Sequence, residues 1–259
     1  MDPPENPGGL QEPFTLSGRP SADRAARSFK PRGRMTPRLR RALDTLAPSL
    51  LIPTVATLLD VAAQFGRSAP LLVDLGFGMG DTTLALASQH PEANVLGIDV
   101  HLPGIARVAE LAAGQGLTNI RLIAADGIDV LRHMVAPGSV SLLQVAFPDP
   151  WPKPSQRHRR LVDPSFVSLA ASRLIPGGLF RLATDVDDYA DQILRALTEE
   201  PGLANMVASD APRDPQRPVT KFERRAIAAG RSVRDFAFCR PAAVAAELQR
   251  VSSKTAGST

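Results

Sequence analysis

The chain has 259 residues, 44% of them hydrophobic, a formal net charge of +4 and a single cysteine, Cys239. This length and apolar content suit one α/β domain and argue against a second full domain, while one cysteine excludes an internal disulfide. The four histidines form no zinc-like cluster and no apolar run approaches the roughly 20 residues of a membrane span. We therefore expect a cytoplasmic protein without a metal or a membrane contact, monomeric by default with a homodimer as the alternative.

Positive charge is concentrated near the N-terminus. Residues 19 to 41 hold nine Arg or Lys against one Asp, which leaves the rest of the chain mildly acidic. Such a segment favours a polyanionic partner whose binding weakens with salt, with a membrane surface as the weaker alternative. From the Pro, Gly and Ser content we expect residues 1–34 to be a disordered basic arm, residues 35–242 to form the folded domain and residues 243–259 to be a flexible tail.

The first ordered elements are expected to be helices. Order should begin near Thr36, because Pro37 stands where a first helical turn accepts proline, and apolar residues follow at helical spacing as far as Leu46. A second helix is expected over residues 54–65. The first strand, Leu71–Leu75, follows it.

A glycine loop connects that strand to a helix expected over Asp81–Gln89. The loop reads Gly76-Phe-Gly78-Met-Gly80, and glycines let a backbone approach a nucleotide-like cofactor closely. The dinucleotide fingerprint needs a third glycine where this chain has Asp81, so the spacing favours S-adenosylmethionine over NAD.

Acids near the ends of three predicted strands are candidate cofactor ligands. Asp99 ends the strand Asn94–Asp99, about 20 residues beyond the glycine loop, where a ribose-binding carboxylate is expected. Asp126 follows the third strand, where adenine would lie, with helix capping as the alternative. Asp74 fits two interpretations equally well: a cofactor ligand, or a strand-end acid that accepts hydrogen bonds from nearby backbone N–H groups.

The rest of the chain continues the alternation of strands and helices. The expected elements are a helix over 103–113, strand 119–124, a short helix to Met134, strand 140–146, a helix over 164–174, a turn at Gly177-Gly178, strand 179–184 and a helix opened by Asp185 and Asp187. This order predicts a doubly wound, mostly parallel, Rossmann-like sheet that holds its ligands at the carboxyl ends of the strands.

The stretch Phe147-Pro-Asp149-Pro-Trp151-Pro-Lys153 follows the fourth strand directly. It brings a carboxylate, the only tryptophan and a cation to the edge of the sheet, which is where α/β enzymes hold their ligands. A basic run comes next and is a candidate for RNA contact: Arg157, His158, Arg159 and Arg160. A third basic cluster lies between residues 217 and 234, so nucleic acid is the favoured partner.

Several motifs together resemble the bacterial tRNA (guanine-N(7)-)-methyltransferase family of class I S-adenosylmethionine-dependent enzymes. They are FPDPWPK, GFGMG with GIDVH, ATD followed by Tyr189, and RPVTKFERR, and the resemblance covers about residues 27–238. It implies transfer of a methyl group from S-adenosylmethionine to N7 of guanosine 46 in the variable loop of tRNA, which forms 7-methylguanosine.

The resemblance also implies roles for particular residues. Asp149 takes the active-site position. Cofactor contacts are implied at Asp74, Asp99, Asp126 and Asp149, beside the loop glycines Gly76, Gly78 and Gly80. Contacts with the tRNA substrate are implied at Lys153, Asp185, Thr220, Lys221, Phe222 and Glu223. Without the resemblance, the Thr220–Arg225 segment indicates only the start of an amphipathic helix.

Two departures from the family pattern are visible. Relatives usually carry Glu at the positions of Asp74 and Asp99, and they run more continuously basic after Lys153, where this chain has Pro154-Ser-Gln156. Three alternatives stay open: another RNA or DNA base methyltransferase, a non-catalytic RNA-binding protein and, least favoured by the glycine spacing, an NAD oxidoreductase.

Overall fold

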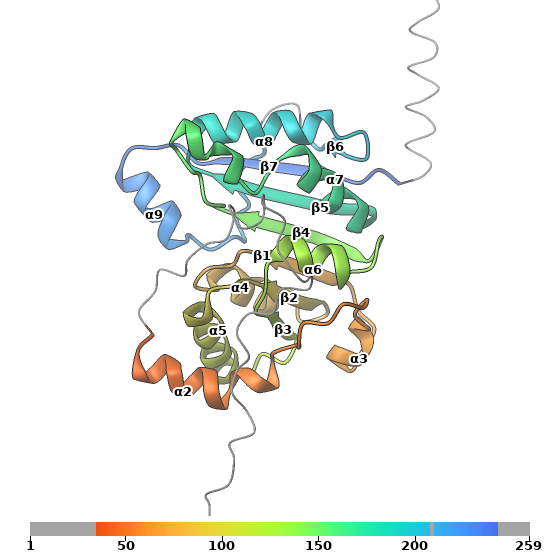
Figure 1. Ribbon diagram of the computed structural model, residues 1–259, viewed down its shortest axis with the longest axis vertical. Helices are drawn as coiled ribbons and strands as arrows, with labels where there is room; N and C mark the ends of the chain where they lie inside the picture. The colour runs from red at the N-terminus through yellow and green to blue at the C-terminus, as the bar shows by residue number, and fades with distance from the viewer. Residues whose placement is uncertain (1–34, 208–209, 243–259) are drawn as a thin grey trace, which may run out of the picture.

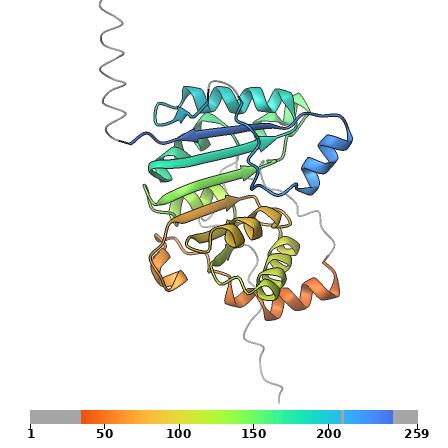
Figure 2. The same cartoon turned by 180° about the vertical axis from the view of Figure 1, so that it is seen from behind.

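The computed structural model describes residues 35–207 and 210–242, and these residues form one twisted sheet between two layers of helices (Figures 1 and 2). The expected arm 1–34 and tail 243–259 lie outside the described residues, so the predicted domain limits stay predictions. No helix within the described part of the chain is long and apolar enough to cross a membrane.

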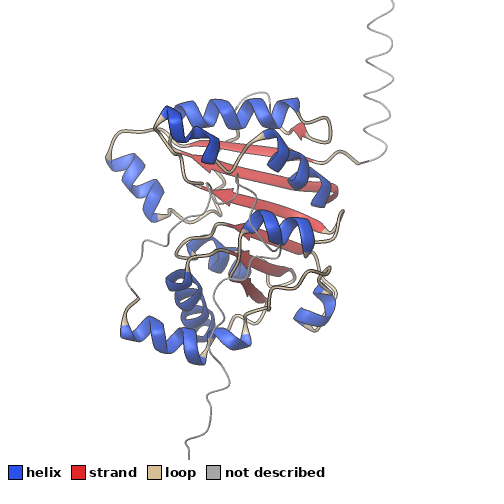
Figure 3. Ribbon diagram, in the orientation of Figure 1, coloured by secondary structure: helices blue, strands red, loops and turns tan. Residues whose placement is uncertain are grey.

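Seven strands make the sheet in the order β3-β2-β1-β4-β5-β7-β6. Their bounds are β1 Leu71–Leu75, β2 Asn94–Ile98, β3 Ile120–Ile123, β4 Val140–Ala146, β5 Leu174–Thr184, β6 Ala204–Asn205 and β7 Arg234–Cys239. Strands β1 to β5 pair in parallel, whereas β7 runs antiparallel to both β5 and β6. The predicted doubly wound, mostly parallel sheet is therefore confirmed, and Figure 3 shows the parallel strands with their carboxyl ends on one side.

One helical layer covers β1, β2 and β3. It contains α2 (Pro37–Thr45), η1 (Ala47–Ser49), α4 (Asp81–Gln89) and α5 (Leu102–Gln115). Its apolar residues form one core cluster with the facing side chains of the sheet, for example Leu43, Ile105 and Leu122. The first described helix, α2, begins at Pro37 as expected, and Thr36 caps it, because its side chain accepts a hydrogen bond from the Leu39 N–H.

The second layer covers the opposite face. It contains α3 (Val61–Phe65), α6 (Gly127–His133), α7 (Pro164–Arg173) and α8 (Asp187–Glu199). A short helix, η2 (Pro154–Arg159), follows β4, and α9 (Lys221–Ala228) stands apart at the edge that holds the carboxyl ends of the strands (Figure 1).

Two local expectations were wrong. The helix expected over residues 54–65 is only α3, because Asp60 caps its start and the Leu59 N–H donates to the Met134 carbonyl instead of to a helix. The Gly177-Gly178 pair is not a turn before the strand, because β5 runs through it. Gly177 has φ +81°, and a side chain on Gly178 would meet the Val140 carbonyl oxygen at 2.9 Å, so the glycines form an irregular step within the β4–β5 ladder.

Candidate functional site at the carboxyl edge of the sheet

The glycine loop between β1 and α4 is an open backbone cradle. Gly76, Gly78 and Gly80 all have positive φ, at +71°, +59° and +81°. Among the described residues, no atom lies within 4 Å of where a side chain on Gly76 or Gly78 would begin, whereas at Gly80 it would meet Val108 at 2.0 Å. The first two glycines therefore present bare backbone to open space, and the third lets α4 pack against α5.

Asp99 holds this loop in place from the end of β2. Its Oδ2 accepts a hydrogen bond from the Gly78 N–H at 2.6 Å, and its Oδ1 accepts one from the His101 N–H at 2.8 Å. Burial raises the pKa of the Asp99 carboxyl, although both backbone N–H groups favour its charged form. Each carboxylate oxygen can accept a second bond, so the group can bind ribose hydroxyls while it supports the loop.

Asp74 lies behind the loop and has no exposed surface. The hydroxyls of Thr82 and Thr83 both donate to its Oδ2 at 2.7 Å, and Gln144 donates to its Oδ1 at 3.3 Å. Burial raises the pKa of this carboxyl, against the opposing effect of those donors. Asp74 thus ties the start of α4 to β1 and β4, and its direct contact with a cofactor stays a prediction.

Asp126 is exposed at the end of β3 and caps α6. Its Oδ1 accepts hydrogen bonds from the N–H groups of Ile128 and Asp129. Capping, the alternative that the sequence left open, is therefore present. It fixes one carboxylate oxygen and leaves the outward side of the group facing solvent, so adenine contact stays a prediction.

The loop after β4 has an unusual backbone at both ends. Phe147 has φ +54° and Trp151 has φ +40°, in a region where residues with side chains are uncommon. The Phe147 N–H donates to the Ala183 carbonyl on β5, and the Arg159 guanidinium lies over the Trp151 ring at 4.9 Å. Between these two anchored ends, Asp149 is exposed at the edge of the sheet, as is Lys153 just beyond them.

The basic run after this loop is divided between surface and interior. Arg157 and His158 are exposed, although Arg157 also pairs with Asp188 at 2.8 Å. The expectation of RNA contact at Arg160 needs correction, because Arg160 is only 2% exposed. Its guanidinium donates to the Pro150 carbonyl, Gln192 and Asp188, so it supports the loop from below.

Residues of α9 and its neighbours complete this edge. Thr220 caps α9 by accepting from the Glu223 N–H, and Glu223 is 1% exposed in ion pairs with Arg213 and Arg217. A Thr-x-x-Glu capping pattern was visible in the sequence, but these arginine partners were not. Lys221 and Phe222 are exposed.

Asp185, at the end of β5, pairs with Arg231 at 2.8 Å. The predicted substrate contacts at Asp185, Thr220 and Glu223 would therefore share these side chains with internal partners, and they stay predictions.

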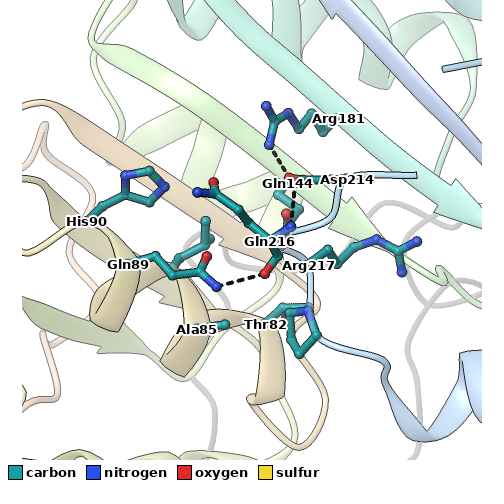
Figure 4. A pocket seen from close by; sticks show the side chains of 11 residues that line it. Thr82, Ala85, Gln89, His90, Gln144, Arg181, Asp214, Gln216 and Arg217 are labelled. Atoms are coloured by element: carbon teal, nitrogen blue, oxygen red, sulfur yellow. Dashed lines mark hydrogen bonds and ion pairs between the residues drawn. The ribbon is translucent and has the colours of Figure 1, made fainter. Parts of the chain in front are cut away.

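The hollows beside this edge lie beneath the segment that precedes α9. One is lined by α4, β4, β5 and residues 214–218, where Gln89 donates to the Gln216 carbonyl and Asp214 pairs with Arg181 (Figure 4). A larger cavity of about 300 Å³ lies over β4, β5 and β7. In the part of the chain that the structure describes, no group of acids, histidines or cysteines could hold a metal ion.

The arrangement fits S-adenosylmethionine. A glycine cradle with free space in front of it, followed by acids at the ends of β2 and β3, offers backbone N–H groups and carboxylates to a nucleoside with an amino-acid tail. The exposed carboxylate of Asp149 lies on the neighbouring strand-end loop.

Comparisons with known proteins agree with this geometry. Residues 68–236 match the family described as "Putative methyltransferase". The tRNA (guanine-N(7)-)-methyltransferase of Burkholderia vietnamiensis strain G4 is 46% identical over 225 residues, which cover 86% of this chain and 88% of that protein. The protein of the same name from Nitrosospira multiformis is 46% identical over 84% of this chain and 96% of its own length. Among solved structures, that of the 16S rRNA methyltransferase KamB superposes with a TM-score of 0.53 at 16% identity, over 74% of this chain and 98% of that one, which supports the fold alone.

Proposed function

Because this chain belongs to the tRNA (guanine-N(7)-)-methyltransferase family, we propose that it methylates N7 of guanosine 46 in the variable loop of tRNA. The chain is an S-adenosylmethionine-dependent methyltransferase; the target position and the 7-methylguanosine product are our proposal. The observation that carries it is the placement of Asp149 on the loop after β4, next in the sheet to the glycine cradle after β1. With tRNA as the substrate, the reaction would take place in the cytoplasm.

The cofactor would be held by the cradle and the strand-end acids. Backbone at Gly76 and Gly78 would face its amino-acid end, Asp99 its ribose hydroxyls and Asp126 its adenine. When bound, S-adenosylmethionine supplies an electrophilic methyl group on a sulfonium. Asp99 would both recognise the ribose and keep the cradle in shape, because the same carboxylate binds the Gly78 N–H.

The target atom sets what the protein must do. Guanine N7 has an in-plane lone pair and no proton, so methylation needs alignment of the base and stabilisation of the positive charge that grows on it. A carboxylate at Asp149 can orient the purine and offset that charge, and no strong general base is required. Exposure of Asp149 agrees with this role, since the base has to reach it from solvent.

The tRNA would be held by exposed basic residues around this edge. Lys153, Arg157 and His158 follow the Asp149 loop, and Lys221, Arg224 and Arg225 are exposed on α9. Phosphate contacts of this kind give affinity and register, while the base is read within the site. Phe222 is 53% exposed and can stack on a splayed base. Thr220 and Asp185 would leave their internal partners to bind tRNA, whereas Glu223 would contact the substrate through a carboxylate lone pair while it stays paired with Arg213 and Arg217.

The test is methyl transfer from labelled S-adenosylmethionine to unmodified tRNA transcripts, followed by chain cleavage specific for 7-methylguanosine. We expect label and cleavage at position 46, and neither in a transcript with adenosine at that position. Label without that cleavage would identify another base methyltransferase. Binding of tRNA without any label would identify a non-catalytic RNA-binding protein.

A further inference from the structure

Four charged side chains form a network behind α9; three of them are buried, and the fourth, Arg213, is 34% exposed. Arg217 binds Glu223 through one guanidinium nitrogen at 2.9 Å and Asp235 through another at 3.0 and 3.1 Å. Arg213 binds the same Glu223 at 2.6 and 3.2 Å. Arg217 therefore joins the first turn of α9 to β7 of the central sheet.

This network is well shielded from water. The side chains of Arg217, Glu223 and Asp235 are 4%, 2% and 11% exposed. Burial by itself would raise the pKa of the Glu223 carboxyl, but the bonds from Arg213 and the charge of Arg217 bring that pKa below its ordinary value. Because buried charges are stable only when their partners keep a close and well-aligned geometry, this network is a rigid anchor.

The same arginine also reaches the loop that carries Asp149. Its guanidinium lies over the ring of Phe147 at 5.4 Å, and Phe222 of α9 stacks on that ring at 6.5 Å with 19° between the planes. Phe147 is the residue with φ +54° at the start of the loop, two positions before Asp149. The ring of the residue with this unfavourable backbone conformation thus contacts both Arg217 and Phe222 of α9.

We propose that Arg217 is a positioning residue, which docks α9 against the sheet and, by holding the Phe147 ring, sets the conformation of the loop that presents Asp149. The proposal rests on the proposed function for the role of Asp149. It concerns a residue that precedes the predicted substrate contacts Thr220 to Glu223 in the RPVTKFERR motif, and it couples the position of α9 to the conformation of the loop. The planar fork of an arginine is needed, because one ammonium group cannot bridge two carboxylates and also lie flat on a ring.

Two variants test the proposal. Arg217→Lys keeps the charge and removes the fork. Arg217→Gln combined with Asp235→Asn removes the bridge between α9 and β7 without leaving a charge unpaired, because Glu223 keeps its ion pair with Arg213. This double variant tests the proposal if the lysine variant does not fold. Folding of each is checked by circular dichroism before any other measurement.

Two readouts separate positioning from simple support of the fold. Turnover at saturating tRNA and S-adenosylmethionine should fall at least tenfold, with the cofactor Kd within twofold of wild type. Trp151, the only tryptophan of the chain, lies in the same loop, so its indole ring should become more accessible and acrylamide should quench its fluorescence more strongly. Wild-type turnover and wild-type quenching in a folded variant would overturn the proposal.

Arg234→Met is the matched control. Arg234 also lies near the start of β7, bridges two acids, Asp191 and Asp210, and lies over a phenylalanine ring, that of Phe236 at 5.7 Å. None of these contacts within the described residues involves the loop, so the loss of Arg234 should leave Trp151 quenching unchanged, and an equal change in quenching would contradict a specific role for Arg217. If wild type transfers no methyl group to tRNA, the proposed function fails, while the quenching experiment still decides whether Arg217 holds the loop.

Discussion

At the scale of single residues, the proposed roles of Asp149 and Asp99 are separable, because Asp149 is exposed on the loop after β4 and Asp99 is bonded to the glycine cradle. A carboxylate that stabilises the positive charge growing on the guanine base affects turnover. A carboxylate that binds ribose and supports the cradle affects cofactor affinity.

Asp149→Asn should lower kcat by roughly 100-fold or more, the size of effect seen when one preorganised electrostatic group is removed. The change preserves shape and removes charge, so the Kd for S-adenosylmethionine should stay within a few-fold. Single-turnover methylation together with calorimetric cofactor binding measures both quantities. Undiminished turnover would remove Asp149 from the active site.

Asp99→Ala should weaken S-adenosylmethionine binding by about 10- to 100-fold, since a hydrogen bond to a charged group contributes on the order of 1.5–3 kcal/mol. Titration calorimetry gives the Kd, and the release of the Gly78 N–H should appear as faster amide exchange in the cradle. An unchanged Kd would limit Asp99 to the support of the loop.

The sequence located these acids but not the pairs around Glu223. The glycine spacing and the strand-end acids are local patterns, and they recur in the structure at the expected places. The bonds among Arg213, Arg217, Glu223 and Asp235 join a loop, a helix and a strand with no sequence period. Only the fold brings them together.

At the scale of elements, the cradle depends on how closely α5 approaches it. A side chain on Gly104 of α5 would begin 1.7 Å from the Gly78 carbonyl oxygen. A glycine in this helix therefore allows the loop and helix backbones to touch, and the cofactor site depends on that close approach.

Gly104→Ala should displace the cradle, lower stability by about 1–3 kcal/mol and weaken cofactor binding. Gly114→Ala in the same helix is the matched control, because nothing lies within 4 Å of its new side chain. That variant should gain up to about 1 kcal/mol from helix propensity. Thermal unfolding and cofactor titration test both variants, and equal effects from the two would contradict the close approach of the two backbones.

Elements with strong local signals were predicted well, and elements defined by the sheet were not. The helices α4, α5, α7 and α8 carry clear apolar spacing or capping residues, and they lie close to their expected bounds. The last strand, β7, was not expected, because Arg234–Cys239 is short and becomes a strand through pairing with β5.

At the scale of the whole molecule, exposed basic residues come from separate parts of the chain. Arg40 and Arg41 are exposed on α2, which packs on α5 in the layer that holds the cradle, and α9 adds further cations (Figure 1). Arg217 and Arg234, which the sequence grouped with a third basic cluster, are occupied by ion pairs.

Replacing Arg40 and Arg41 together by Gln should weaken tRNA binding and reduce the salt slope of log K by about 1 for each phosphate that these side chains neutralise. A control with the same change in net charge replaces Arg132 and Arg195, which are exposed on α6 and α8 in the opposite layer. Filter binding at several salt concentrations measures the slopes. Equal slopes for the two double variants would show that only net charge matters.

The position of β7 has a consequence for biosynthesis. This strand is inserted between β5 and β6, although the chain makes it last, and it supplies Asp235 to the network beneath α9. Until it emerges from the ribosome, β5 has an unpaired edge that can recruit other chains. A nascent or prematurely terminated product that ends before residue 234 would contain every residue of the cradle and of the Asp149 loop. Because its β5 edge would stay unpaired, we expect chaperones and proteases to bind it before it could act as an enzyme.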